Sequence, residues 1–236
     1  MQERGVAVPL PQGAPLLALD AAMSTAPETT IAKPRWERRK EARPAELVSA
    51  ALQLFVEKGY AGTRLDDVAA RAGVSKGTLY LYFENKEELF KAVVRENIVA
   101  RISQSAGEIL HFDGSSPELL RRLMTTWWEE YGSNTAGGIG KLMMAESGNF
   151  PEIARFFVEE VIDPWHRILA AVIQRGAERG EFRTVKPEMF ARVVTGPLVM
   201  LSLWKHSFGA CSQQPLDANE YLATHLDIVL SALRPA

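Results

Sequence analysis

Cysteine and histidine are scarce in this chain of 236 residues. It has one cysteine, Cys211, and four histidines that lie far apart. A single thiol excludes an internal disulfide and a cysteine-based metal cage, and the histidines lack the paired spacing of a helical zinc site. We therefore expect no metal, and a cytoplasmic location fits this cysteine content. A redox-sensing Cys211 is the alternative to an inert thiol.

Long apolar runs are also missing. The longest in the body of the chain covers 193–204, which is 12 residues between Arg192 and Lys205. A helix of that length is too short to cross a bilayer. Near the N-terminus, segment 6–19 contains three prolines, which makes it a poor signal peptide. We expect no membrane segment.

The sequence lacks the motifs of catalysis. Gly137-Gly-Ile-Gly-Lys141 has part of a phosphate-binding loop, but Thr135 stands where that pattern needs its first glycine. Leu142 stands where a Ser or Thr must reach magnesium. No GxGxxG follows an expected strand, and no Ser or Cys has a recognisable base. The sequence predicts neither an enzyme nor a bound cofactor.

Charge is distributed unevenly along the chain, whose formal net charge is −2. Residues 33–86 contain 11 Lys and Arg against 7 Asp and Glu. From Glu87 to the end there are 15 against 19. A basic N-terminal part beside an acidic body predicts that only the former contacts nucleic acid.

Residues 63–86 have the pattern of two short helices joined by a tight turn. Apolar residues recur at i, i+3, i+4 and i+7 from Leu65, which predicts a first helix over 65–72 with Thr63 as its N-cap. Gly73 supplies a left-handed backbone position that ends this helix. A turn of three residues containing glycine is typical of a helix-turn-helix, whose second helix enters a major groove.

The second helix is expected over 76–83, capped by Ser75. Leu79 and Phe83 are spaced to pack inward, which leaves a polar face for phosphates and base edges. Gly77 permits close approach of a phosphate to the helix N-terminus. The outward residues are Lys76, Thr78, Tyr80 and Tyr82. The alternative is that the two tyrosines are core aromatics of a small bundle.

Together with 51–60, this pattern resembles the N-terminal domain of the TetR (tetracycline-repressor) family of bacterial transcription regulators. The match covers about 44–95. The residues that carry it are Phe55, Gly59, Tyr60, 69–75, Gly77, Leu79, Tyr80, Tyr82, Phe83 and 86–89. Leu81 departs from the polar or aromatic residue of many relatives, which concerns base preference. The resemblance implies DNA contacts at Thr63, Arg64, Ser75, Lys76, Gly77, Thr78, Tyr80, Tyr82 and Lys86, with Lys86 clamping a phosphate.

Three parts are expected along the chain. Residues 1–43 are a disordered extension, with Met23 as an alternative start, and end in a basic arm that is either a solvated charge run or a DNA contact. Residues 44–90 are the DNA-binding domain, whose first helix covers 45–58 with Pro44 in its first turn. Residues 91–236 are a helical ligand-binding and dimerisation domain. The fourth helix, from an N-cap at Asn85 to about Ile109, would link the two domains.

The C-terminal part is predicted to be helical throughout, so the fold class is all-α. Helices are expected over 116–131, 151–179, 187–208 and 216–233, with a kink at Pro164 and a loop or weak helix start over 132–140. The last two helices are apolar over more than one face. A homodimer through them would bury both sides, and burial within one subunit is the alternative.

Large, soft side chains are frequent in this part of the chain and together suit an apolar pocket for a hydrophobic or planar effector. Ordinary core packing is the alternative for each of them. The predicted pocket residues are Trp127, Trp128, Tyr131, Met143, Met144, Phe156, Trp165, His166, Met200 and Trp204. His166 or Glu146 would supply a polar contact.

The sequence therefore predicts a homodimeric repressor that a small hydrophobic effector releases from a palindromic operator. One alternative is a ligand-independent DNA-binding regulator or activator whose C-terminal domain serves dimerisation and partner binding. A small-molecule binding protein with a vestigial helix-turn-helix is another.

Overall fold

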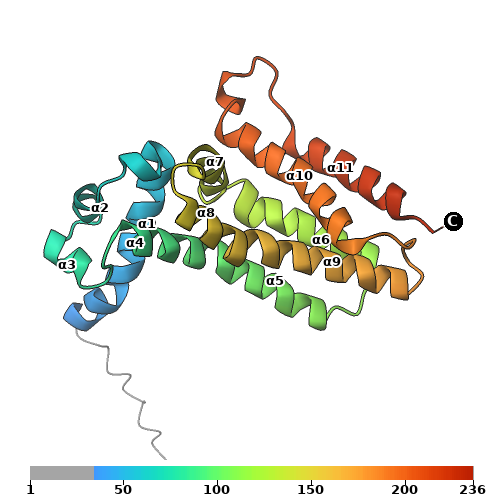
Figure 1. The fold of residues 1–236 in the computed structure, drawn as a ribbon, viewed down its shortest axis with the longest axis horizontal. Helices are drawn as coiled ribbons and strands as arrows, with labels where there is room; N and C mark the ends of the chain where they lie inside the picture. Colours follow the sequence, from blue (N-terminus) through green and yellow to red (C-terminus); the bar gives the residue numbers. More distant parts are fainter. Residues whose placement is uncertain (1–34, 236) are drawn as a thin grey trace, which may run out of the picture.

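The computed structural model describes residues 35–235, and at 35–42, 108 and 110 it describes the backbone alone. Residues 1–34 of the predicted extension, including the alternative start at Met23, and the basic side chains of the arm before Arg43 lie outside the described residues. Every regular element in the described part is a helix (Figure 1), which confirms the all-α prediction. No described helix is long and apolar enough to cross a membrane.

The N-terminal part consists of a long helix followed by two short ones and the start of a fourth. These are α1 (Arg35–Gly62), α2 (Leu65–Arg71), α3 (Lys76–Tyr80) and α4 (Lys86–Val94). The prediction of a first helix over 45–58 with Pro44 in its first turn is wrong about the start, because α1 begins at Arg35 and Pro44 lies inside it. Proline removes one backbone donor, and the helix continues on both sides of that missing bond.

Local signals place the turns of this unit as the sequence predicts. Gly59 and Gly73 have φ angles of 77° and 66°, a region that favours glycine. Ser75 caps α3, since its Oγ accepts from the Thr78 backbone N at 3.1 Å. Asn85 caps α4 in the same way, accepting from the Glu88 backbone N at 2.9 Å.

Thr63 does not cap α2. The N-cap of α2 is Arg64, with no side-chain capping bond. The Thr63 side chain is buried, and its hydroxyl donates to the carbonyl oxygens of Gly59 at 2.7 Å and Leu54 at 3.0 Å. It closes the end of α1, because carbonyls there have no partner within the helix.

The C-terminal part is a bundle of longer helices. They are α5 (Ala100–Leu110), α6 (Ser116–Trp127), α7 (Gly137–Glu146), α8 (Pro151–Phe157), α9 (Asp163–Glu178), α10 (Pro187–His206) and α11 (Ala218–Leu233). The exposed Cys211 lies in a short 3₁₀ turn, η4 (Gly209–Cys211), between α10 and α11. The last two helices, predicted over 187–208 and 216–233, are confirmed as α10 and α11, with ends that differ by at most two residues.

Three π-helical turns interrupt this part of the chain. They are η1 (Arg95–Val99) between α4 and α5, η2 (Trp128–Gly132) after α6, and η3 (Val158–Ile162) between α8 and α9. The last one lies directly before Pro164, where a kink is predicted. Because proline cannot donate to Glu160, a π turn is a way for the helix to pass this position.

Two apolar cores hold the molecule together. One is formed mainly by α6, α9, α10 and α11. The other contains Phe55 of α1 and Phe90 of α4, and also Ile139 of α7 and Ile153 of α8. The predicted division after residue 90 falls inside α4, and this second core extends across it. α7 and α8 therefore pack directly on the DNA-binding unit, as Figure 1 shows.

Two glycines let α7 sit tightly between α1 and α10. A Cβ at Gly137 would lie 2.7 Å from His206 Nε2, and a Cβ at Gly138 would lie 2.7 Å from a methyl carbon of Val56. The glycine-rich stretch is thus a helix start, one of the two options that the sequence left open.

Candidate DNA interface and ligand cavity

The exposed surface of α3 lies at the end of the molecule farthest from α11 (Figure 1). Leu79 is fully buried beneath it. Tyr80 is 46% exposed, which contradicts the alternative that it is a core aromatic, whereas Tyr82 is half-buried. Leu81 is 82% exposed beside Tyr80. The turn that ends α3 after Tyr80, rather than at 83, points Leu81 outward, and the sequence analysis did not assign it a contact.

Polar residues surround this surface as predicted. Arg64, Ser75, Lys76 and Gly77 are exposed, and Thr78 is half-buried. Lys76 Nζ lies 2.8 Å from an oxygen of Asp66, and this contact raises the pKa of Lys76. Both side chains are mostly exposed, so the pair is weak and a phosphate can replace the carboxylate at low cost.

Lys86 binds backbone carbonyls at the end of α1. Its ammonium donates to the backbone oxygens of Tyr60 at 2.8 Å, Thr63 at 3.2 Å and Ala61 at 3.3 Å. It also lies 4.5 Å from the centre of the Tyr60 ring. Burial lowers the pKa of Lys86. The ammonium caps the C-terminal end of α1, where a positive charge is favourable, and the phosphate contact that the resemblance implies for Lys86 stays a prediction. The Thr63 side chain is buried, so it does not present its hydroxyl to a phosphate.

A cavity of about 640 Å³ lies within the C-terminal part. Residues of α5, α6, α7, α9 and α10 border it, and its lining is mostly apolar. The cavity opens to the surface, where Met144 and Met200 are exposed. Seven predicted pocket residues line it, namely Trp127, Tyr131, Met143, Met144, Trp165, His166 and Met200. This volume is typical of a site for a small organic ligand.

Three predicted pocket residues are placed elsewhere. Trp128 belongs to the core of α6 and α9, and Lys205 Nζ lies 5.7 Å from its ring centre. Phe156 faces the α4 side, where the Arg95 guanidinium lies 5.1 Å from its ring centre. Trp204 packs against Phe208, with ring centres 5.9 Å apart. Trp128 and Phe156 lie at or close to π turns, which shift the face that a helix presents.

Phe157 lines the cavity, whereas its neighbour Phe156 does not. Ile98, Ile102 and Val161, for which the sequence predicts no pocket contact, also line it. Glu146, proposed as a polar contact, is not among the lining residues. Its carboxylate accepts from the Tyr60 and Ala61 backbone N at 2.7 and 3.1 Å.

Few polar groups face the cavity, and most have partners. Arg101 pairs with Glu130 at 2.6 Å, and Lys141 Nζ donates to the His206 carbonyl at 2.8 Å. The exceptions are in two lining residues: Trp165 Nε1 and His166 Nδ1 are buried without a hydrogen-bond partner among the described residues. Burial, and next the charge of Arg192, lower the pKa of His166, which favours its neutral form.

A helix-turn-helix joined by one continuous helical path to a bundle with an apolar cavity defines a class of protein, the DNA-binding transcription regulators. No group of three His, Cys, Asp or Glu side chains that could hold a metal occurs among the described residues.

The chain belongs to the TetR family. The family model described as "Bacterial regulatory proteins, tetR family" matches residues 47–93, and that described as "Tetracyclin repressor-like, C-terminal domain" matches 113–209. The chain is a helix-turn-helix transcription regulator, and family membership sets it apart from enzymes.

Relatives and solved structures agree with this assignment. The transcriptional regulator AcuR of Cereibacter sphaeroides is 30% identical over 171 residues, covering 67% of this chain and 76% of AcuR. The repressor DhaR of a Mycobacterium species is 27% identical, covering 80% and 91%. The Bacillus subtilis regulator FadR, solved in complex with stearoyl-CoA, has a TM-score of 0.63 at 19% identity, covering 80% of this chain and 99% of FadR.

Proposed function

We propose that this regulator is a homodimeric repressor that a small hydrophobic effector releases from a palindromic operator in the cytoplasm. One observation carries the proposal: Ile98, Met143 and Phe157 line the cavity and also belong to the core that holds the DNA-binding helices. A ligand that displaces these side chains would therefore disturb the packing of α1 and α4. Densely packed cores transmit such displacements because they contain few voids.

Contact with DNA is proposed for the exposed face of the helix-turn-helix. Arg64, Lys76 and the N-terminal turn of α3 would bind phosphates, while Tyr80 would reach base edges. Ser75, Gly77, Thr78 and Tyr82 complete the proposed contact set.

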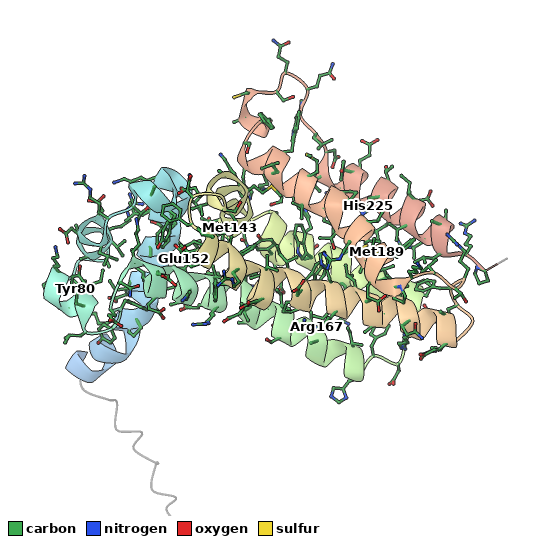
Figure 2. All side chains as sticks on the ribbon, viewed as in Figure 1. Tyr80, Met143, Glu152, Arg167, Met189 and His225 are labelled. Atoms are coloured by element: carbon green, nitrogen blue, oxygen red, sulfur yellow. The ribbon has the colours of Figure 1, made fainter. Side chains whose placement is uncertain are left out.

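An exposed apolar stripe on α10 supports the homodimer. Met189, Val193 and Met200 are 61%, 71% and 54% exposed, and Ile228 of α11 is 61% exposed. Figure 2 shows Met189 on the side of the molecule formed by α10 and α11. Two copies joined through these helices would cover the stripe by two-fold symmetry, and a two-fold protein fits a palindromic site.

The cavity lining supports an effector that is mostly apolar and carries a hydrogen-bond acceptor. The unpartnered Trp165 Nε1 can only donate. A long acyl chain with a carbonyl or carboxylate head has this chemistry. Relatives include a "Fatty acid metabolism regulator protein" of Bacillus subtilis, which supports acyl compounds as the first to test. Several relatives are described as repressors, which supports the direction of regulation.

The test is selection of binding sites from random DNA by the purified protein at about 150 mM salt, because non-specific phosphate binding is weak there. An enriched palindrome is expected. Its release is then measured with a panel of fatty acids and acyl-CoA thioesters. An enriched single half-site would contradict the dimer. A palindrome that no member of the panel releases would favour the ligand-independent alternative.

A further inference from the structure

The end of α1 turns toward α2 through a short segment, 59–63, whose backbone groups are held by two opposite charges. The ammonium of Lys86 on α4 donates hydrogen bonds to the carbonyl oxygens of Tyr60, Ala61 and Thr63. On the amide side, Glu146 Oε1 lies 2.7 Å from the Tyr60 backbone N, and Glu146 Oε2 lies 3.1 Å from that of Ala61. Each charged group thus binds backbone atoms of opposite partial charge: the ammonium binds carbonyl oxygens, and the carboxylate binds amide N–H groups.

The two charges come from different parts of the fold. Lys86 belongs to the DNA-binding unit itself, whereas Glu146 is the last residue of α7 and lies 86 residues from Tyr60 in sequence. Gly59 is fitted to this contact, because a Cβ there would lie 2.5 Å from Glu146 Oε1. Any other residue at 59 would expel the carboxylate.

The helix that carries Glu146 also forms a wall of the cavity. Gly140, Met143, Met144 and the following residue Ser147 all line it. The N-terminal end of α7 is wedged between two helices: Gly137 lies against His206 of α10, and the next residue, Gly138, lies against Val56 of α1. A ligand in the cavity therefore touches the same helix whose last side chain holds the turn before α2.

We propose that Glu146 is a positioning residue that couples the α7 wall of the cavity to the helix-turn-helix, by a route separate from the α4 link. The inference rests on the proposed function, since it names how the cavity and the DNA surface communicate. When α7 moves, the hydrogen bonds of Glu146 lengthen, and the 59–63 turn loses the partner of its amides. Hydrogen bonds weaken steeply with poor geometry, so a displacement of about 1 Å is enough to switch them.

Charge-assisted hydrogen bonds suit this role because they are roughly twice as strong as neutral ones. Loss of the Glu146 contact leaves the amide of the exposed Ala61 to water, whereas the amide of the buried Tyr60 loses its partner. An unsatisfied amide is costly, so the turn is expected to adopt a second arrangement, which a switch requires. Since α2 begins at Leu65, directly after the turn, its position changes with it.

The test compares the wild-type homodimer with Glu146→Gln and Glu146→Ala. The control is Glu152→Gln, which removes an exposed carboxylate at the start of α8 (Figure 2). The charge of Glu152 acts on Tyr60, but its carboxylate does not hold the backbone of the turn as that of Glu146 does. The probe is anilinonaphthalene sulfonate, whose fluorescence reports apolar cavities, and energy transfer from Trp127 and Trp165 shows that it lies near them. Its dissociation constant is measured with and without the selected operator. The ratio of the two constants is the coupling between the sites.

The wild type and Glu152→Gln are expected to give a ratio of about five or more, within the usual range of allosteric coupling. Glu146→Ala should give a ratio near one, and the free variant should bind the probe as tightly as the free wild type does. Glu146→Gln keeps one acceptor oxygen and should therefore give an intermediate ratio. Thermal unfolding checks that the variants are folded. The inference is overturned if a folded Glu146→Ala protein keeps the wild-type ratio. It is also overturned if the wild type binds the operator but either does not bind the probe or binds it equally well with and without operator. A wild type that selects no site contradicts the proposed function itself.

Discussion

Arg95 and Glu160 join two π-helical turns by a two-point ion pair. Arg95 Nε lies 2.9 Å from Glu160 Oε2, and Arg95 Nη2 lies 2.6 Å from Glu160 Oε1. Arg95 belongs to η1 and Glu160 to η3, so the pair fixes the α4–α5 helix to the α8–α9 helix. Both helices line the cavity. The pair therefore sets the spacing of two cavity walls as well as their contact with the DNA-binding unit.

We expect Arg95→Ala to destabilise the protein by about 1 kcal/mol, since the pair is bidentate yet partly exposed. Loss of guanidinium packing on Phe156 adds to this effect. The measurement is urea unfolding at neutral pH. Arg167→Ala on α9, whose side chain is exposed (Figure 2), is the control and should change stability little. Equal effects of the two variants would show that the ion pair contributes nothing measurable.

The same pair predicts a pH dependence. The hydrogen bonds from Arg95 hold the pKa of Glu160 below its usual value of about 4.5. A carboxyl whose pKa is lower in the folded state stabilises the fold above its unfolded pKa. This contribution is lost as the pH falls through the folded pKa. The difference in stability between the wild type and Glu160→Gln should therefore shrink on acidification below about pH 4.5, the unfolded value. A constant difference down to pH 2 would contradict it.

Tyr80→Ala should weaken operator binding by about 1–3 kcal/mol and reduce the preference for the selected sequence over random DNA. The reason is that Tyr80 is exposed on α3 and makes no large contribution to the core. Fluorescence anisotropy with both DNAs measures it. Tyr221→Ala, a half-buried tyrosine on α11, is the control and should leave sequence preference unchanged. Unchanged operator affinity in Tyr80→Ala would mean that α3 is not the recognition helix.

Lys86 and Lys76 should respond differently to removal of their charge. Lys86→Ala is expected to destabilise the fold by about 1–3 kcal/mol, because backbone carbonyls at the end of α1 lose a charged donor. Lys76→Ala should leave the melting temperature nearly unchanged and reduce the salt dependence of DNA binding by about one unit of slope. Thermal unfolding and salt titration measure the two effects. If Lys86→Ala instead lowered the salt dependence of DNA binding and left the melting temperature unchanged, Lys86 would be a phosphate contact.

Val193→Glu should weaken the proposed homodimer, because a charge would replace a 71% exposed apolar side chain at the centre of the α10 stripe. Sedimentation velocity should then show monomer at concentrations where the wild type is dimeric. The control is Ala171→Glu on α9, which adds the same charge at an exposed position on another helix. A dimeric Val193→Glu protein would place the interface elsewhere.

Turns and helix ends of this protein could be predicted from the sequence because each depends on a few neighbouring residues. Gly73, Ser75 and Asn85 illustrate this: Gly73 adopts a positive φ, and the other two cap the helix that follows them. The apolar repeat of α2 and the mostly apolar α10 and α11 likewise depend on local spacing.

Contacts between distant parts of the chain could not be predicted in the same way. Thr63 resembles an N-cap in sequence, yet its hydroxyl serves the end of the preceding helix. Phe156 and Phe157 are adjacent and chemically identical, and only the packing around η3 decides which one lines the cavity. A π turn changes the phase of a helix, and its position depends on tertiary packing as well as on sequence.

The helix-turn-helix, the all-α class and the aromatic richness of the C-terminal part follow from residue type and short spacing. The sites at which the charged residues act depend on how the helices pack. Lysine and glutamate are usually found on the protein surface. Lys86 and Glu146 bind the same segment of backbone because α4 and α7 both pack against α1. Such partners are chosen by the geometry of the folded chain, where an unsatisfied amide or carbonyl is costly and the nearest matching charge is held in place.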